Sequence, residues 1–514
     1  MFRGAHHLAI KDAYFIDNST ARSGLEILLS KSMPDAFHDS GARDPPPRCH
    51  LGTRQGYITK IVGWAHGNCD RNQPLLWMYG PFGVGKTAVA QSCADALESG
   101  HKLAASLFFS RSNADRDDPQ RLFTSIAYQI ATKCEEYCNT IEYRIRRDPA
   151  ITAKSLSKQF KELFVHPLSQ IDIAESGLEG RVVIVDGLDE CRGTIEQRAI
   201  IDIITTSARN GTAPFRWFLT SRPEDHLVRS MNSESVSNIS AHLELPVSRA
   251  IGHEILIFVT DEFKKIREDR GLSDSWPHEE VLSLLVRRAA GLFIFAATIV
   301  RFVSDDNSFG PQDQLRIVLE FLEGVPPGNG GQGNPLEEMD RFYTLIMQRI
   351  PSKLLTTVRK ILLLKDLGLF SVYGTADYLS LSEEQFRGVC AYLQSVVELR
   401  DGPWFWHVDM DFYHASFLDF IKAPRRSKEL CIYDIAGSLP GPTLIDDGTD
   451  LSVPEVLQNG TEMLKISDKN EKRVMFRPNP GSGHISYQSR KHGIVQIEAI
   501  KEIRTGGNTK YDHQ

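Results

Sequence analysis

Residues 77–97 read WMYGPFGVGKTAVAQSCADAL and place Gly80, Gly85, Lys86 and Thr87 at the spacing G-x-x-x-x-G-K-[ST]. The apolar run LLWMY before the glycines predicts a strand, and TAVAQSCADALES after them predicts a helix. In that context, backbone N–H groups at the start of the helix converge on phosphate oxygens. The stretch therefore predicts a phosphate-binding loop, and a glycine-rich turn without a ligand is the alternative.

The residues of this loop have distinct expected roles in binding a nucleoside triphosphate. Gly80, Gly83 and Gly85 leave room for a close approach of the phosphates. Lys86 neutralises the β- and γ-phosphates, and the Thr87 hydroxyl ligates Mg²⁺. The predicted cofactors are therefore ATP or GTP together with Mg²⁺.

A second predicted strand carries acidic residues at its carboxyl end. Residues 181–191 read RVVIVDGLDEC, an apolar run that ends in Asp186. Such a run is typical of a buried parallel strand, and ligands bind beyond the carboxyl ends of these strands. Asp186 is therefore the second predicted Mg²⁺ ligand. Asp189 and Glu190 follow on the same loop and are predicted to polarise a water molecule against the γ-phosphate, unless they face solvent at a helix N-terminus.

A third predicted strand delivers an arginine to the same edge of the sheet. Residues 216–225 read RWFLTSRPED, and Thr220, Ser221 and Arg222 stand where the strand ends. A guanidinium group reads both the charge and the geometry of a phosphate, so Arg222 is predicted to sense the γ-phosphate. The alternative is a surface arginine that caps the loop. Asp189, Glu190 and Arg222 are thus the predicted catalytic residues.

The composition is that of an ordinary globular chain. Of its 514 residues 41% are hydrophobic and 24% charged, enough for several domains with their own cores. The formal net charge of -7 disfavours general nucleic-acid binding, so no nucleic-acid partner is predicted. The longest apolar run, AAGLFIFAATIV at 289–300, is too short to cross a membrane and predicts a buried helix. Eight cysteines without a C-x-x-C pair predict reduced thiols, no metal cluster and a cytoplasmic location.

The order of segments predicts more than one domain. Short apolar runs alternate with amphipathic segments over residues 75–226, which is typical of an α/β fold with a mainly parallel sheet. Residues 240–305 are predicted to be helical. EGVPPGNGGQGNP at 323–335 predicts a flexible linker, and MDRFYTLIMQRI at 339–350 returns to a helical period.

Together these motifs resemble a known family. The order GPFGVGKT, VVIVDGLDEC, FLTSRPED is similar to the NACHT branch of the signal-transducing (STAND) P-loop ATPases, in particular the large fungal set of the nephrocystin-3-like N-terminal type. Further similar stretches are AFHDSGARDPPPRCHLGTRQGYITKIVGWAHG, RRAAGLFIFAATIVRFV and FYHASFLDFI. The resemblance covers roughly residues 1–435. It implies a parallel-sheet P-loop NTPase core followed by helical and winged-helix domains.

The motifs and the resemblance together give an expected division of the chain. The expected parts are an N-terminal extension (1–50), the NTPase core (51–230), a helical domain (231–322), a linker (323–335), a winged-helix-like domain (336–450) and a C-terminal β segment (451–514).

The resemblance implies a switch between ATP and ADP states. His414 matches the histidine that reaches from the winged helix to the β-phosphate, and Gly52, Thr53 and Arg54 lie where the family approaches adenine and ribose. Phe293 departs from the proline that many relatives place against the adenine. Such a switch hydrolyses its nucleotide slowly, recruits an unknown protein partner in the ATP state and forms a nucleotide-dependent oligomer. An ATPase or GTPase with steady turnover is the alternative, and both use the same loop.

The C-terminal segment suggests a different partner. Residues 451–514 alternate apolar and polar residues between turn signals, which predicts antiparallel strands. They resemble the first half of the PH domain of fungal phosphoinositide-specific phospholipase C, without its catalytic domains. Lys465, Lys472, Arg473 and Arg477 fall on the first two strands, and ten lysines and arginines outnumber seven aspartates and glutamates in the segment. The resemblance implies a weak contact with anionic lipid, and a membrane-recruited scaffold is the alternative function.

Overall fold

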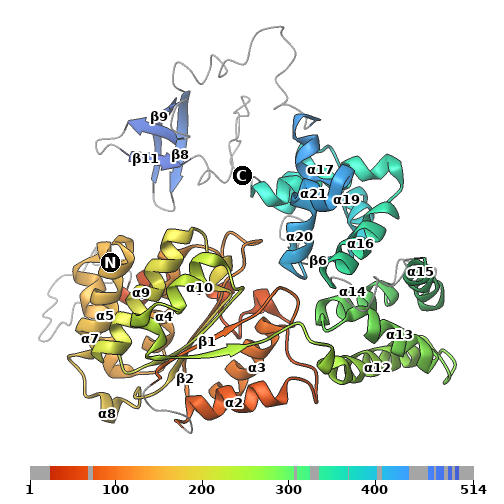
Figure 1. The fold of residues 1–514 in the computed structure, drawn as a ribbon. Coiled ribbons are helices and arrows are strands. Elements are labelled where there is room, and N and C mark those ends of the chain that lie inside the picture. The colour runs from red at the N-terminus through yellow and green to blue at the C-terminus, as the bar shows by residue number, and fades with distance from the viewer. Residues whose placement is uncertain are drawn as a thin grey trace, which may run out of the picture. The chain divides into compact units, whose positions relative to one another are not determined.

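A computed structural model describes residues 23–67, 73–305, 310–324, 335–368, 370–401 and 408–438, and four strands between residues 461 and 496. The chain divides into two compact units, Met1–Leu439 and Pro440–Gln514. Figure 1 shows the sheet and helices of the first unit and the small sheet of the second.

The first unit is built on a sheet of five strands in the order β2-β3-β4-β1-β5. All four neighbouring pairs run parallel, as the sequence predicts. The strands are β1 (Leu75–Tyr79), β2 (Leu103–Phe108), β3 (Val182–Asp186), β4 (Arg216–Ser221) and β5 (Ser240–Glu244). Because β4 lies between β1 and β3, the segments that follow these three strands gather at one edge of the sheet.

Alternate residues of the strands face two separate hydrophobic cores. Leu76 and Met78 of β1 belong to one core, whereas Leu75 and Trp77 belong to the other. This period of two places every second side chain on the opposite face. The first core packs on α2 (Gln55–Ala65) and α3 (Lys86–Ser99). The second packs on α1 (Gly24–Ser30), α4 (Leu122–Ala131), α5 (Glu135–Arg147), α6 (Leu156–Phe160), α9 (Thr194–Asn210) and α10 (Asp225–Met231).

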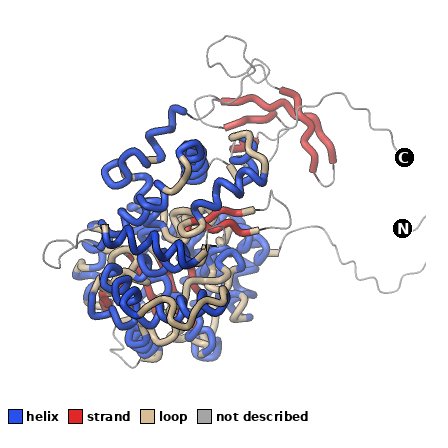
Figure 2. The backbone as a smooth tube through the Cα atoms, turned by 90° about the vertical axis from the view of Figure 1, so that its right-hand side faces the viewer, coloured by secondary structure: helices blue, strands red, loops and turns tan. Residues whose placement is uncertain are grey.

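Helices continue the first unit beyond the sheet, and the blue helical segments dominate the view in Figure 2. Their buried residues extend the core that contains α3. The first four are α12 (Gly252–Asp269), α13 (Glu279–Ala289), α14 (Phe293–Val303) and α15 (Pro311–Glu323). Then come α16 (Pro335–Gln348), α17 (Ser352–Leu367), α18 (Val372–Tyr378), α19 (Glu383–Cys390), the antiparallel pair β6 (Val397–Arg400) and β7 (Asp409–Phe412), α20 (Ala415–Lys422) and α21 (Pro424–Ser427).

Shorter helical turns connect these elements. The short α-helices are α7 (His166–Leu168), α8 (Ile173–Ser176) and α11 (Glu234–Ser237). The short 3-10 or π segments are η1 (Pro34–Ala36), η2 (Gly41–Arg43), η3 (Pro119–Arg121), η4 (Pro149–Ala153), η5 (Lys161–Val165), η6 (Leu188–Glu190), η7 (Arg249–Ile251), η9 (Ala391–Leu393), η11 (Lys428–Leu430) and η12 (Ile432–Ser438).

One prediction is wrong at the start of the segment 240–305. Ser240–Glu244 forms strand β5 rather than a helix, and it pairs in parallel with β1 from Leu75↔Ser240 to Tyr79↔Glu244. Without β5, strand β1 would leave a row of unpaired backbone groups at the edge of the sheet. This non-local pairing outweighs the weak local preference of SAHLE. The sheet therefore extends past residue 230, where the sequence places the end of the core.

The apolar run 289–300 forms a buried helix only in part. Ala290 and Gly291 have φ values of 47° and 98°, which end α13 and separate it from α14. Ile294, Phe295 and Ile299 of α14 are then buried in the core, as predicted. Among the described residues, no helix is both long and apolar enough to cross a membrane. Residues 325–334, most of the predicted linker, lie outside the described residues.

The second unit contains an antiparallel sheet in the order β11-β10-β9-β8. Its strands are β8 (Thr461–Ser467), β9 (Asn470–Asn479), β10 (His484–Gln488) and β11 (Gly493–Gln496), which confirms the predicted C-terminal β segment. Lys465 is paired in register with Lys472, and Leu464 with Arg473. The pairing brings predicted basic positions of two strands together, and the lipid contact stays a prediction.

Candidate functional site

The glycine-rich loop joins β1 to α3 and needs its glycines for two reasons. A side chain at Gly80 would overlap the backbone carbonyl of Leu245, and one at Gly83 would overlap the side chain of Ile294. Gly83 and Gly85 also have φ values of 74° and 96°, a region that other residues rarely adopt. The N–H of Ile294 donates to the Gly83 carbonyl at 3.2 Å. The loop is therefore held against the start of α14.

Lys86 stands at the first turn of α3 beneath this loop. Its Nζ donates to the carbonyls of Gly80 at 2.7 Å and Pro81 at 2.8 Å. Burial lowers the pKa of Lys86 to about 8, although the carboxylate of Asp189 acts in the opposite direction. A buried ammonium group bound mainly by carbonyls gains stability from an anionic ligand.

Asp186 and Thr87 lie together, as the sequence predicts. Asp186 at the end of β3 is 2% exposed, and the Thr220 hydroxyl donates to its Oδ1 at 2.5 Å. Burial raises the pKa of Asp186, and hydrogen bonds with Thr220 and Thr87 oppose that rise. A carboxylate beside a hydroxyl offers the hard oxygen ligands that Mg²⁺ prefers. The donor set of these two residues fits the predicted metal ion.

The start of α3 also fits a phosphate group. Gly85 is its N-cap, and no side chain in the described part of the chain caps its first turn. The first N–H groups of a helix lack partners within the helix and attract an anion when no side chain satisfies them. Lys86 adds a positive charge at the same place. The loop therefore meets the backbone and charge requirements of a phosphate site.

Asp189 and Glu190 lie in η6, directly after β3. Both oxygens of Asp189 are engaged: Oδ1 accepts from the backbone N–H of Arg222 at 2.9 Å, and Oδ2 is 3.4 Å from its Nε. Glu190 accepts from the backbone N–H of Arg111 at 3.3 Å. Burial and the neighbouring Asp189 raise the pKa of Glu190 to about 7. Asp189 is thus placed to orient arginines, and Glu190 has the proton affinity of a general base.

Two residues that the sequence did not single out complete this cluster. Arg111 follows β2 and lies 3.2 Å from Asp189, and Asp419 of α20 lies 2.8 Å from Arg222. The Arg111–Asp419 distance is 3.5 Å. Arg111 follows the apolar run LAASLFF at 103–109, and this run was a usable signal. Asp419 offered none, because its partners stand 308 and 197 residues away in the chain.

His414 lies beside the same cluster, at the N-cap of α20. Its ring centroid is 6.2 Å from that of Phe82 in the glycine-rich loop. The backbone N–H of Ser416 donates to Nδ1 at 3.1 Å, so Nδ1 is an acceptor and the ring proton is on Nε2. Burial, followed by the charges of Arg222 and Lys86, lowers the pKa of His414 to about 3. The residue is a neutral imidazole with one N–H to donate.

Thr53 and Arg54 lie at the other side of the loop. Arg54 donates from Nη2 to the carbonyl of Val84 at 2.8 Å, and its guanidinium lies 5.0 Å from the ring centroid of Phe293. The Thr53 hydroxyl instead donates to the carbonyl of His50 at 2.7 Å and holds its own turn. Arg54 thus contacts the glycine-rich loop, and the predicted adenine and ribose contacts of both residues stay predictions.

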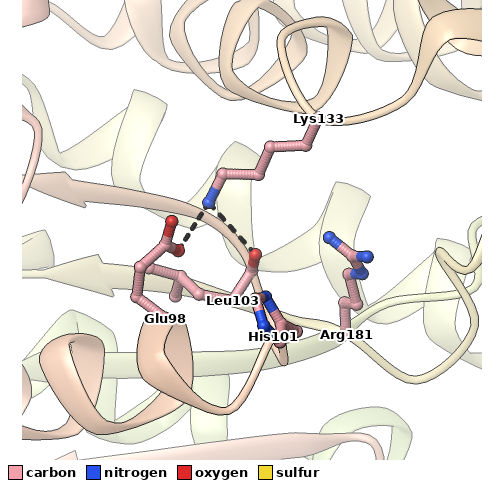
Figure 3. A pocket seen from close by; sticks show the side chains of 5 residues that line it. All are labelled: Glu98, His101, Leu103, Lys133 and Arg181. Atoms are coloured by element: carbon pink, nitrogen blue, oxygen red, sulfur yellow. Dashed lines mark hydrogen bonds and ion pairs between the residues drawn. The ribbon is translucent and has the colours of Figure 1, made fainter.

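A hollow of about 230 Å³ lies away from this cluster. Figure 3 shows its lining side chains, with Lys133 directed toward Glu98 and the carbonyl of Leu103. His101 and Arg181 complete the lining. Leu103 begins β2 and Arg181 precedes β3, so the hollow lies at the amino ends of these parallel strands, opposite the glycine-rich loop.

The parallel sheet, the glycine-rich loop between β1 and α3, and Asp186 at the end of β3 define the fold of a P-loop NTPase. The sequence model of the family described as Nephrocystin 3, N-terminal, matches residues 59–222, which include β1 to β4. No curated protein matches the sequence.

Three solved structures that match the chain illustrate the extent of the likeness. The Orc1 protein of Aeropyrum pernix in complex with DNA is 14% identical, with 81% of this chain and 98% of that chain covered and a TM-score of 0.30. Cdc6p of Pyrobaculum aerophilum is 13% identical, with 79% of this chain and 100% of that chain covered and a TM-score of 0.33. AMPPCP-bound DnaA of Aquifex aeolicus is 12% identical, with 70% of this chain and 91% of that chain covered and a TM-score of 0.26.

Proposed function

We propose that the chain is a nucleotide-dependent switch of the NACHT type, closed with ADP and open with ATP–Mg²⁺. The observation that carries this proposal is the position of His414. This residue caps α20, yet it lies near Phe82 of the glycine-rich loop and is within the electrostatic reach of Lys86. A ligand of the loop is thereby linked to a helix more than 300 residues away in the sequence.

The protonation state of His414 supports a role in holding the closed form. A neutral imidazole with its proton on Nε2 donates one hydrogen bond to a phosphate oxygen while Nδ1 continues to cap α20. Loss of that contact favours the open form, because a ligand shifts an equilibrium only by its differential affinity for the two states. In the open form, α20 is free to recruit a protein partner or a second copy of the chain.

Slow hydrolysis of the bound triphosphate resets the switch. Bound Mg²⁺ supplies charge neutralisation between the phosphates, and Thr87 with Asp186 would hold it. Glu190, whose pKa is raised to about 7, accepts the proton of the attacking water, and Asp189 keeps Arg222 in position. Arg222 is the predicted ligand of the γ-phosphate. The same groups serve a steadily turning-over NTPase, so turnover separates the two functions.

The test is the nucleotide that the purified full-length chain carries. We expect denatured protein to release close to one equivalent of ADP, and the intact protein to hydrolyse added ATP more slowly than it exchanges ADP. Lys86→Ala should lose the nucleotide. Lys133→Ala, a matched loss of a lysine in the hollow at the opposite edge, should retain it. An empty wild type that turns over ATP or GTP continuously would support the steady NTPase instead.

A further inference from the structure

Two arginines that follow separate strands share two carboxylates beside the glycine-rich loop. Arg111 follows β2, and Arg222 follows β4. Both reach Asp189 Oδ2, at 3.2 and 3.4 Å, and both reach Asp419, at 3.5 and 2.8 Å. The four side chains form one ion-pair cluster in which each guanidinium bridges both carboxylates.

The two carboxylates differ in how firmly they are held. The side chain of Asp189 is 1% exposed, and its Oδ1 also accepts the backbone N–H of Arg222, so it belongs to the core itself. The side chain of Asp419 is 22% exposed and comes from α20. Asp189 therefore holds the arginines from within the core, whereas the contact of Asp419 depends on the position of α20.

Asp419 occupies the position of an anionic ligand of these arginines. A guanidinium fork binds a carboxylate and a phosphate with the same geometry. Although burial acts in the opposite direction, Arg222 and Arg111 lower the pKa of Asp419, so it stays ionised. The two arginines already face two carboxylates. A γ-phosphate at the same arginines would add about two negative charges and repel Asp419.

On the basis of the switch proposed above, we propose that Arg111 is a second ligand of the γ-phosphate beside Arg222, and that Asp419 competes with the γ-phosphate for this arginine pair. ADP lacks the third phosphate and leaves the ion pairs between α20 and the core intact. ATP displaces Asp419 and releases α20. The ion-pair cluster thus distinguishes a triphosphate from a diphosphate, and this role differs from that of His414.

The inference predicts a selective gain in affinity for ATP. Asp419→Asn removes the competing charge, so binding of a slowly hydrolysed ATP analogue should tighten about tenfold while the affinity for ADP changes less than about twofold. Both dissociation constants are measured by calorimetry on the full chain. Asp419→Glu keeps the charge and should stay within about threefold of the wild type.

A matched control exists in the same part of the chain. Asp340 is 21% exposed and pairs with Arg426 between α16 and α21, so Asp340→Asn breaks a comparable ion pair away from the loop. It should leave the ratio of the two affinities unchanged. An equal change for ADP and the ATP analogue in Asp419→Asn, or the same selective gain in Asp340→Asn, would overturn the inference.

A second variant tests Arg111 directly. Arg111→Gln in the Asp419→Asn background should return the affinity for the ATP analogue to the wild-type value or below, without an effect on ADP. Unchanged affinity for the analogue would show that Arg111 supports only Asp189, and the inference would fail. Absence of Lys86-dependent nucleotide binding in the wild type would overturn the proposed function as well. The two failures are therefore distinguishable.

Discussion

Acidification should open the closed form through His414, and the size of the effect follows from its surroundings. Its ring lies near that of Phe82, and the charges that act on it are those of Lys86 and Arg222 from the core, Asp419 from its own helix and Arg301 from α14. Burial and the three cations lower its pKa from 6.5 to about 3, against the influence of Asp419. The ring is therefore protonated more readily when it is exposed to solvent than in the closed form.

The sign and the magnitude come from linkage between protonation and opening. Because the pKa in the closed form lies below the solvent-exposed value, the closed form is most stable above pH 6.5 and loses stability as the pH falls toward 3. At pH 5.5 the loss is about 1.4 kcal/mol, and at pH 7.5 it is below about 0.1 kcal/mol. Opening of α20 should thus be about tenfold more frequent at pH 5.5 than at pH 7.5.

Hydrogen exchange of the backbone amides in α20 measures this opening, after correction for the intrinsic effect of pH. The control is His414→Asn, because asparagine is a strong N-cap residue but does not titrate. Neighbouring carboxylates, including Glu190 with its raised pKa, titrate in both proteins and cancel in the comparison. Equal pH dependence of exchange in the wild type and in His414→Asn would refute the reasoning.

Three further changes have defined expected results. Gly83→Ala should lower the free energy of unfolding by about 3 kcal/mol and weaken nucleotide binding. The added methyl group would overlap the side chain of Ile294, and the φ of 74° is strained for alanine. Thermal melts measure the stability, and calorimetry measures the nucleotide affinity. Glu190→Gln should bind ATP normally but hydrolyse it at least about a hundredfold more slowly in single-turnover assays. Tyr343→Phe removes the hydroxyl contact with Ser416 at 2.7 Å and should lower the free energy of unfolding by about 1 kcal/mol in urea titrations.

Sequence reasoning predicted the parts of the site that depend on short-range spacing. Gly85, Lys86 and Thr87 are adjacent in the chain, and Asp186 ends a strand whose apolar run is visible in the sequence. The carboxyl ends of parallel strands meet at one edge, so the proximity of Thr87 and Asp186 followed from the sheet alone. The fold class of the chain could therefore be predicted from these motifs alone.

The features that escaped prediction depend on long-range packing. Asp419 reaches Arg222 only because α20 folds back on the core, and no periodicity in either segment carries that information. Strand β5 forms because β1 provides an edge to pair with, whereas its own residues have weak preferences. Interactions between distant segments thus decided the arginine cluster, while local spacing decided the phosphate loop.

The two hydrophobic cores of the first unit are completed at different times while the ribosome makes the chain. The core that packs on α4, α5 and α9 ends at Val236, so its residues are synthesised early. The core on the face of α3 includes residues as late as Ile432. At synthesis rates of ~5–20 residues per second, roughly 10–40 s separate the two. During that interval the apolar residues of the first core that are already made lack their later partners, and we expect chaperones that bind hydrophobic surfaces to bind the nascent chain.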